Sequence, residues 1–160
     1  MLTGVCQPRF VAIMPQPGEW IMEDGDSYIL ESQIGFVMRR VVQRHIAIFS
    51  SLIPDLTPTQ FAALAKLCEL GQASQNELGR LTSMDVATIK GVVDRLRGRG
   101  LVSAEPLASD KRRLNLTPTP QGKALYRKLV SRAREVSQQT LSPLSEAESQ
   151  QLIVLLSKLD

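Results

Sequence analysis

Three consecutive cations, Lys111, Arg112 and Arg113, stand in the stretch ASDKRRLNLTPTPQGKAL, residues 108–125. A short alternating run and two Thr-Pro pairs follow them, which places the cations at a tight turn beside rigid backbone. Clustered Lys and Arg side chains can neutralise a row of phosphates. A basic turn by itself is more often a solvated surface feature, so the elements around it must decide between the two interpretations.

The cations of the whole chain are concentrated in its middle. The net charge is only +3, but residues 71–134 contain 13 Lys or Arg against 5 Asp or Glu, a balance of +8. Residues 1–70 have 5 against 7, and residues 135–160 have 1 against 4. A basic middle between acidic ends indicates a polyanion-binding module on a separate scaffold.

A second group of candidate residues lies on a helix predicted from about Met84 to Arg97 and ended by Gly98 and Gly100. We expect Ser83 to cap this helix, with Asp85 in its first turn. Its predicted apolar face consists of Val86, Ile89, Val92, Val93 and Leu96. Its opposite face is small, polar or basic and consists of Ala87, Thr88, Lys90, Gly91 and Arg95. Such a face after a short helix and a tight turn is typical of a helix-turn-helix.

Caps and apolar spacing predict the remaining elements. A helix is expected over residues 28–52, capped by Asp26 or Ser27, with an apolar stripe at Leu30, Ile34, Val37, Val41, Ile48 and Leu52. Capping boxes or cap-proline pairs start further helices at Thr57, Ser74, Thr119 and Ser145. The stretches LVSAEPL and LNLT on either side of the basic tip predict a two-stranded wing. The predicted fold is therefore mainly α with a small β-wing: a winged helix-turn-helix with six helices.

Several classes of protein are not favoured by the sequence. The first 25 residues lack a basic start and are interrupted by Pro8, Pro15 and Pro17, so we expect neither a secretion signal nor a membrane helix. The two cysteines, Cys6 and Cys68, lack the spacing of a zinc site or disulfide framework, which favours the reducing cytoplasm. No catalytic motif is present, so we expect no enzyme, no cofactor and no metal.

Two motifs carry a resemblance to a known family: LGRLTSMDVATIKGVVDRLRGRGLV, residues 78–102, and DKRRLNLTPTPQG, residues 110–122. The first resembles the recognition helix, and the second the wing, of the MarR family of transcriptional regulators. The architecture matches over residues 27–160. One departure is Pro118, where the family usually has Leu; since proline cannot donate a ladder hydrogen bond, we expect the returning strand to end by Thr117.

The resemblance implies a homodimeric DNA-binding regulator, in most members a repressor, that releases DNA when a small aromatic acid binds. It implies a DNA-binding lobe at 57–118 and a helical dimerisation region at 27–56 and 119–160. Residues 1–26 are expected to form an N-terminal arm that is mobile or loosely docked. The stretches RH (Arg44 and His45), LTPTQFA and MDVATIKGV also resemble the branch of the family that controls nicotinate and related aromatic catabolism.

The predicted DNA contacts come from the recognition helix and the wing. We expect Thr88 and Lys90 near base edges in the major groove, with Ala87 or Gly91 permitting close approach. The wing cations would contact phosphates or enter the minor groove, and Asp94 would orient an arginine such as Arg112. The complete predicted set is Ser83, Ala87, Thr88, Lys90, Gly91, Arg95, Lys111, Arg112 and Arg113. A dimer predicts a pseudo-palindromic operator on double-stranded DNA, with half-sites about 10 base pairs apart.

The predicted effector is a small aromatic or heteroaromatic carboxylate. Such a ligand needs a cation or donor and an apolar stacking surface, which gives the candidate set Phe36, Arg39, Arg40, Arg44, His45 and Phe49. His45 on an apolar stripe is, without the resemblance, more often a core histidine bonded to a backbone carbonyl. Arg39 and Arg40 are equally compatible with plain solvated positions.

Two other functions compete with a ligand-responsive repressor. A winged helix can serve as a protein-interaction module without sequence-specific DNA binding. A repressor can also sense oxidation through a low-pKa cysteine, but Cys68 stands among apolar residues and Cys6 has only Arg9 nearby.

Overall fold

The computed structural model describes residues 28–107 and 110–159, and of residues 107 and 110–113 it describes the backbone only. The predicted N-terminal arm, residues 1–26, lies outside the described residues. Those that are described form six α-helices, a short 3-10 helix η1 and a three-stranded sheet, in the order η1 (Leu30–Ser32), α1 (Ile34–Leu52), α2 (Pro58–Leu70), β1 (Ala73–Ser74), α3 (Gln75–Leu81), α4 (Val86–Gly98), β2 (Val102–Leu107), β3 (Asp110–Pro118), α5 (Pro120–Leu141) and α6 (Glu146–Leu156). The prediction of a mainly helical winged helix-turn-helix with six helices is confirmed.

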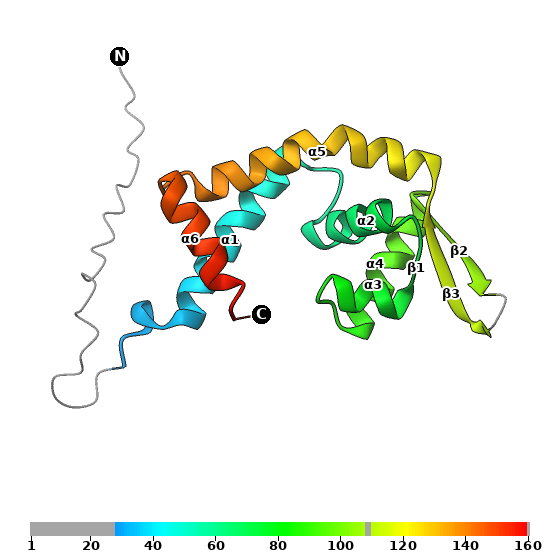
Figure 1. Ribbon diagram of the computed structural model, residues 1–160, viewed down its shortest axis with the longest axis horizontal. Helices are drawn as coiled ribbons and strands as arrows, with labels where there is room; N and C mark the ends of the chain where they lie inside the picture. Colours follow the sequence, from blue (N-terminus) through cyan, green and yellow to red (C-terminus); the bar gives the residue numbers. More distant parts are fainter. Residues whose placement is uncertain (1–27, 108–109, 160) are drawn as a thin grey trace, which may run out of the picture.

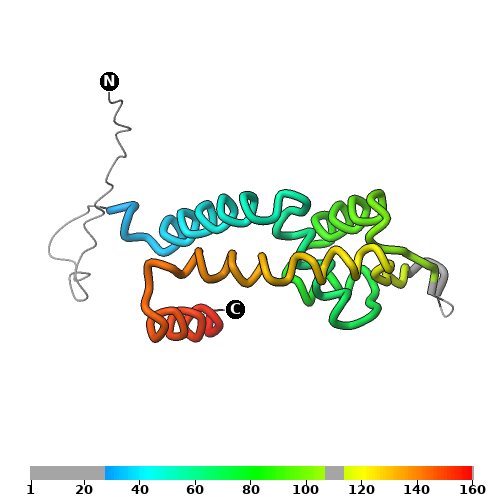
Figure 2. The backbone as a smooth tube through the Cα atoms, turned by 90° about the horizontal axis from the view of Figure 1, so that it is seen from above, coloured from blue at the N-terminus to red at the C-terminus, as the bar shows by residue number. Residues whose placement is uncertain are grey.

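The molecule is elongated along α5. This helix runs across the top from the β2–β3 hairpin at one end to α6 at the other (Figure 1). Helices α2, α3 and α4 gather with the sheet beneath one half of α5, and α1 packs along the other half (Figures 1 and 2). A single helix therefore connects two differently built regions.

The first long helix begins later than the sequence predicted. Residues 30–32 form η1, and α1 starts only at Ile34, after Gln33 in an extended conformation. The Ser32 hydroxyl and the Gln33 amide both donate to the backbone oxygen of Ile29, at 2.8 and 3.2 Å. These local bonds offer the backbone an alternative to a continuous helix, which explains the break at residue 33.

Two predicted capping boxes fix the start of α2 and α3. The Thr57 hydroxyl accepts from the backbone N–H of Gln60 at 3.2 Å, and the Gln60 side-chain oxygen accepts from the N–H of Thr57 at 3.2 Å. Ser74 and Glu77 repeat the exchange at the start of α3. Each box satisfies two N–H groups that the first helical turn leaves without partners.

The sheet has the antiparallel order β1-β3-β2. Strand β1, only two residues long, pairs Ala73 with Leu116 and was not predicted. The expectation that the returning strand ends by Thr117 is wrong, because β3 continues to Pro118, which is buried and pairs with Val102. The last position of a strand tolerates proline, since the chain leaves the ladder there and the N–H of Thr119 bonds the Leu101 oxygen at 3.0 Å.

The apolar core lies where α2, α3 and α4 meet the sheet and the first half of α5. Its fully buried side chains include Leu64, Leu67, Leu78, Ile89, Leu96, Leu101 and Leu116. Helix α1 contributes to this core near its end, through Phe49, and Ile53, which follows the helix, is buried there as well. The DNA-binding lobe predicted from the sequence thus contains most of the buried apolar residues.

The opposite end of the molecule exposes many apolar side chains on α1, on α6 and just before α1, which together we call the α1/α6 face. It is formed by Tyr28, Ile29, Leu30, Ile34, Val37, Met38, Val41, Val42, Ile46, Ile153, Val154, Leu155, Leu156 and Leu159, all at least 36% exposed. Within the described chain, α6 buries none of its side chains. No described helix is apolar over a stretch long enough to span a lipid bilayer.

Candidate nucleic-acid interface

The turn between α3 and α4 brings the two helices into close contact. A Cβ at Gly79 would lie 3.1 Å from both the Met84 oxygen and a methyl carbon of Ile89, so glycine lets the helices approach. The N–H of Met84 bonds the Gly79 oxygen at 2.8 Å, and Ser83 adopts a positive φ of 50°. The left-handed conformation of Ser83 changes the direction of the chain between α3 and α4 within a few residues.

Helix α4 is fixed by one face and leaves the other free. Ile89, Val92, Val93 and Leu96 are buried, as predicted. The predicted inclusion of Val86 is wrong: its side chain is 72% exposed. Val86 lies on the same side of the helix as Val93, seven residues later, so its exposure comes from its position at the first residue of α4, before the first buried residue, Ile89.

The cap of α4 differs from the prediction. Helix α4 begins at Val86, and its N-cap is Asp85 rather than Ser83. One Asp85 carboxylate oxygen accepts the backbone N–H of Thr88 at 2.8 Å, and the other accepts the Thr88 hydroxyl at 2.8 Å. These hydrogen bonds from Thr88 hold the pKa of Asp85 below its ordinary value. The left-handed turn at Ser83 moves the helix start two residues along the chain.

The outward face of α4 carries the predicted base-contacting residues. Ala87, Thr88, Lys90 and Arg95 are exposed and Gly91 is half-buried. Asp94 lies on this face as well, with a carboxylate oxygen 3.9 Å from a guanidinium nitrogen of Arg97. Small residues along the middle of the face and cations beside them are suited to close approach to a polyanion.

The three wing cations belong to β3, whose backbone the structure describes. Lys111, Arg112 and Arg113 precede Leu114, which pairs with Pro106 of β2. They lie at the end of the hairpin that points away from the helices (Figure 1). Their side chains lie outside the described atoms, so phosphate contact, and the pairing of Arg112 with Asp94, stay predictions.

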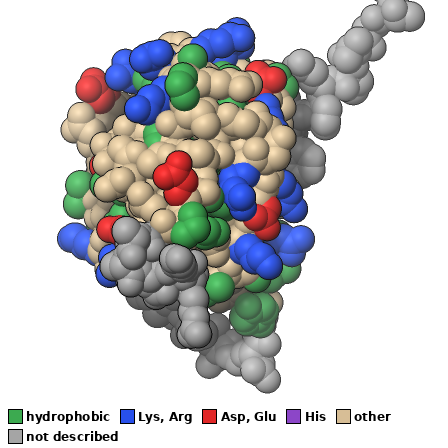
Figure 3. Space-filling model, turned by 90° about the vertical axis from the view of Figure 1, so that its right-hand side faces the viewer, with side chains coloured by type: hydrophobic (Ala, Val, Ile, Leu, Met, Phe, Trp, Pro, Cys, Tyr) green, Lys and Arg blue, Asp and Glu red, His purple; other side chains and the backbone are tan. Residues whose placement is uncertain are grey.

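The end of the molecule that carries the hairpin is rich in cations. Figure 3 views this end, and Lys and Arg side chains stand along its upper edge and its right side, with single acidic side chains between them. This distribution agrees with the basic middle of the sequence.

The wing joins α5 through a contact that only glycine permits. A Cβ at Gly122 would lie 2.1 Å from the Leu101 oxygen, well inside van der Waals contact. Thr119 caps α5 by accepting the N–H of Gly122 at 3.1 Å and donates its hydroxyl to the Gly100 oxygen at 2.7 Å. The predicted Thr-x-x-Gly spacing therefore fixes the angle between wing and helix.

The candidate ligand residues separate into two groups on α1. His45 and Phe49 face α5 and α2, where the rings of Phe49, Phe61 and Tyr126 follow one another at centroid distances of 6.0 and 6.1 Å. His45 Nδ1 lies 3.0 Å from the hydroxyl of Thr140, which donates its hydrogen to the Val136 oxygen at 2.8 Å. The hydroxyl must therefore accept from His45, so we assign the proton of the neutral ring to Nδ1. Nε2 is left as an acceptor.

The arginines of α1 have different surroundings. Arg44 donates to the Gln139 oxygen at 3.0 Å and to the Ser142 hydroxyl at 3.4 Å, so it ties α1 to the end of α5. The Arg40 guanidinium lies 5.9 Å from the centre of the half-buried Phe36 ring, a cation–π arrangement. Arg39 is exposed.

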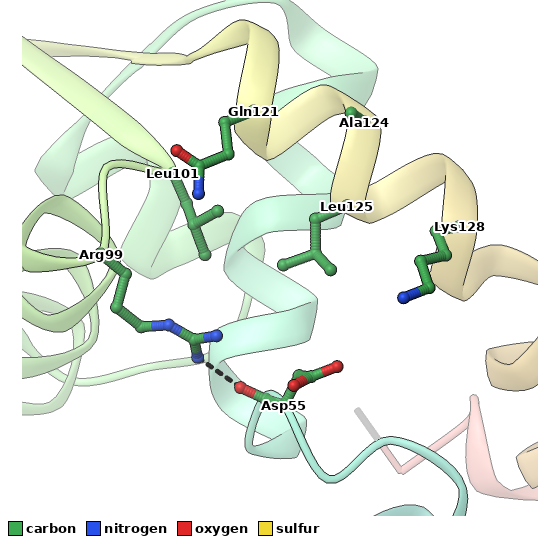
Figure 4. A pocket seen from close by; sticks show the side chains of 7 residues that line it. All are labelled: Asp55, Arg99, Leu101, Gln121, Ala124, Leu125 and Lys128. Atoms are coloured by element: carbon green, nitrogen blue, oxygen red, sulfur yellow. Dashed lines mark hydrogen bonds between the residues drawn. The ribbon is translucent and has the colours of Figure 1, made fainter.

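A surface cleft of about 370 Å³ lies beside the first half of α5, and none of the six candidate ligand residues lines it. Leu101, Leu125 and Ala124 form its apolar part. Arg99, Lys128 and Gln121 point toward it, and Arg99 donates to the backbone oxygen of Asp55 (Figure 4). This hydrogen bond connects the end of α4 to the loop before α2.

Cys68 does not have the surroundings of a reactive thiol. It is half-buried, and burial raises the pKa of its thiol although Lys123 and Arg127 act in the opposite direction. A thiol with a raised pKa is a poor nucleophile at neutral pH. In the described part of the chain, no group of three or more His, Cys, Asp or Glu is arranged to hold a metal ion.

A helix-turn-helix with an exposed basic recognition helix, followed by a β-wing, defines the class of winged-helix transcriptional regulators. The model of the MarR family matches residues 56–114. The chain is 36% identical over 138 residues to the HTH-type transcriptional repressor NicR of Pseudomonas putida, a match that covers 85% of this chain and 87% of the relative. The chain therefore belongs to the MarR family of transcriptional regulators.

Two solved structures agree with this assignment. A probable transcriptional regulator from Pseudomonas aeruginosa is 47% identical, with a TM-score of 0.80 over 82% of this chain and 100% of that one. BpsR of Bordetella bronchiseptica, whose DNA binding is regulated by 6-hydroxynicotinic acid, is 36% identical, with a TM-score of 0.80 over 84% and 97% of the two chains.

Proposed function

We propose that this chain is a ligand-responsive repressor that binds a pseudo-palindromic operator as a homodimer and is released by a small aromatic or heteroaromatic carboxylate. The observation that carries the proposal is helix α4: its buried face holds it rigidly, and its free face presents small and cationic residues. The repressor NicR and the 6-hydroxynicotinic acid-regulated BpsR are relatives that support it. Because the proposed partner is chromosomal DNA, we place its action in the cytoplasm.

In this proposal α4 enters the major groove and the wing binds the backbone. Lys90 is the cation placed to reach base edges, and Ala87 and Gly91 let the helix backbone come close. Lys111, Arg112 and Arg113 neutralise phosphates beside it, which gives affinity and a steep salt dependence. Ser83 and Arg95 flank this surface and complete the proposed contacts.

The α1/α6 face is the proposed dimer interface. An exposed apolar surface of this extent is uncommon on a monomer and marks a site of association. With α1, α5 and α6 as dimerisation region and residues 57–118 as DNA-binding lobe, two copies of α4 would stand about one turn of DNA apart, roughly 34 Å. The expected operator is therefore an inverted repeat with half-sites about 10 base pairs apart.

The effector is proposed to bind beside α1. His45 Nε2 offers an acceptor to a ring hydroxyl or N–H, and the neighbouring Arg44 offers charge to a carboxylate. Phe36 and Arg40 form a separate group about 13 Å nearer the start of α1 and on its other side, so a small acid at His45 would not contact them in the same chain. Arg39, six residues before His45, is the second candidate cation. Phe49 is 4% exposed, and its ring centre lies 6.4 Å from that of His45, so we propose that it packs against the histidine rather than against the ligand. A bound acid would act on α1 where it contacts α5, the helix that continues into the wing.

The first experiment is selection from randomised duplexes with the full-length protein at physiological salt. Enrichment of an inverted repeat with half-sites about 10 base pairs apart is expected. Uniformly weak binding would instead favour the interaction-module function. Lys90→Ala is expected to cost about 1–3 kcal/mol on the operator, whereas Arg112→Ala weakens all duplexes and lowers the salt slope by about 1. Lys158→Ala, beyond α6, serves as the matched control and leaves both unchanged.

The second experiment tests the effector. Fluorescence anisotropy of the operator is measured while 6-hydroxynicotinate, nicotinate or benzoate is added. His45→Ala is expected to weaken the response to the acid and leave operator affinity nearly intact. Equal loss of both would assign a structural role to His45.

The third experiment tests assembly. Ile153→Glu places a charge on the α1/α6 face, where it would have to be buried without a partner, and is expected to give a monomer in sedimentation. Because each half-site then binds alone, operator affinity is expected to fall by more than 100-fold. If the variant stays dimeric, Ile153 does not belong to the dimer interface, and that interface lies on another surface.

A further inference from the structure

The first turn of α4 contains a hydroxyl whose hydrogen is already used. Thr88 donates it to one carboxylate oxygen of Asp85 at 2.8 Å, while the other oxygen accepts the backbone N–H of Thr88 at 2.8 Å. An ionised carboxylate can only accept hydrogen bonds, so the direction of both bonds is fixed. The part of the Thr88 oxygen that remains open to solvent therefore consists of lone pairs.

Thr88 also stands where a recognition helix reads sequence. It is the third residue of α4, its side chain is exposed, and residues near the N-terminus of such a helix are those that contact base edges. In the major groove, adenine N6 and cytosine N4 donate, whereas guanine O6, thymine O4 and the purine N7 accept. The direction of one hydroxyl therefore decides which of the two groups of edges it can bind.

We propose that Asp85 sets the hydrogen-bond polarity of Thr88, so that Thr88 acts on DNA only as an acceptor and selects a base with an amino group, adenine or cytosine. Asp85 does this without touching the base, as a positioning residue for specificity. The inference rests on the proposed function, because it needs an operator that α4 reads. It adds the chemistry of one base position, which neither the fold nor the relatives' names specify.

The substitution Asp85→Asn tests the polarity directly. Asparagine is also a good N-cap and has a single acceptor oxygen, which the N–H of Thr88 occupies. Its amide nitrogen then faces the Thr88 hydroxyl and donates to it, which frees the hydroxyl hydrogen to point outward. The variant should gain affinity for guanine and thymine, whose O6 and O4 accept, and lose affinity for cytosine, which has no major-groove acceptor; adenine keeps N7 as an acceptor. The substitution also removes a negative charge. The loss of charge by itself raises the affinity for all duplexes alike, so it does not account for a change in the preferred base.

The experiment is parallel selection from randomised duplexes with wild type, Thr88→Val, Thr88→Ser and Asp85→Asn. The selected duplexes are then titrated with all four bases at each half-site position. At one position per half-site, the wild type should favour adenine or cytosine by roughly threefold to tenfold, the range of one net hydrogen bond. Thr88→Val keeps the shape and should lose this preference, and Thr88→Ser should keep it. Asp85→Asn should shift it toward guanine or thymine. Thr59→Val, on α2, is the control for the same change elsewhere.

Three outcomes would overturn the inference. If Thr88→Val ranks the bases as the wild type does, Thr88 reads nothing, and the proposed function still stands. If Thr88→Val loses the preference but Asp85→Asn retains it, Thr88 reads the base without control by Asp85. If the wild type enriches no inverted repeat, the proposed function fails and this inference with it.

Discussion

The lobe of residues 57–118 and the region of α1, α5 and α6 use their apolar residues in opposite ways. In the lobe, Leu64, Leu78 and Leu116 are completely buried by neighbours from the same chain. On α6, Val154 and Leu155 remain 56% and 49% exposed. The lobe buries its apolar side chains within one chain, whereas the helical region leaves an apolar surface exposed, of the kind that marks a site of association. Substitutions of the same kind should therefore have different effects in the two regions.

The largest effect is expected at the joint between the regions. Gly122→Ala places a Cβ 2.1 Å from the Leu101 oxygen, which neither backbone can avoid without moving. We expect a loss of more than about 4 kcal/mol in the free energy of unfolding, measured with urea. Gly35→Ala on α1 is the matched control, since no described atom lies within 4 Å of its Cβ; it should stabilise by up to about 1 kcal/mol. If the two variants unfold with similar free energies, the close contact between Gly122 and Leu101 is not important for stability.

The next prediction compares two leucines. Leu64→Ala should cost about 2–5 kcal/mol at any protein concentration, because it leaves a cavity in the lobe. Leu155→Ala should change the unfolding of the dissociated chain by less than about 1 kcal/mol and weaken self-association instead. Urea unfolding over a hundredfold range of protein concentration separates the two. A concentration-independent loss at Leu155 would contradict the contrast between the regions.

A smaller difference is expected between two capping boxes. Thr57→Ala removes the cap of α2 within the lobe and should cost about 1 kcal/mol in global unfolding. Ser145→Ala removes the same type of cap from α6, which buries no described side chain. Amide hydrogen exchange should then accelerate in the first turn of α6, with protection in the lobe unchanged. Faster exchange throughout the lobe would mean that α6 stabilises it.

The smallest effect is expected from pH. Hydrogen bonds from Thr88 lower the pKa of Asp85, and hydrogen bonds from Ser145 lower that of Glu148. Each contributes stability that is fully present above the pKa of the unfolded chain, about 3.9 for Asp and 4.3 for Glu, and is lost as the pH falls through the folded value. The stability gap between wild type and Asp85→Asn should therefore close on acidification below about pH 4. Thermal unfolding from pH 6 to pH 2.5 measures it, and a widening gap would contradict the assigned hydrogen bonds.

The sequence predicted those features that depend on neighbours in the chain. The capping boxes at Thr57, Ser74 and Ser145 connect residues three apart, and the buried face of α4 follows from helical spacing alone. The exposed candidates Thr88 and Lys90 followed from the same spacing. For such features the partner of each residue is fixed before the chain folds.

The features that the sequence missed depend on the path of the chain in space. A left-handed turn at Ser83 moved the start of α4 and gave the cap to Asp85, and with it the bond to Thr88. Strand β1 exists because Ala73 lies beside Leu116, 43 positions away. The assignment of the His45 tautomer required Thr140 on α5, which no local pattern connects to α1. The sequence did contain a signal for Asp85, because Asp is as good an N-cap residue as Ser.

Helix α5 also acts as a lever arm. Its 22 residues make a rod of about 33 Å, rigid enough to carry an angle from one end to the other. A tilt of about 5° at the α6 end would displace the Gly122 end by about 3 Å. That displacement is close to 3.4 Å, the rise of DNA along its axis from one nucleotide of a strand to the next. A small change of angle in the helical region would thus move the wing by about one base-pair step along the axis of a bound DNA.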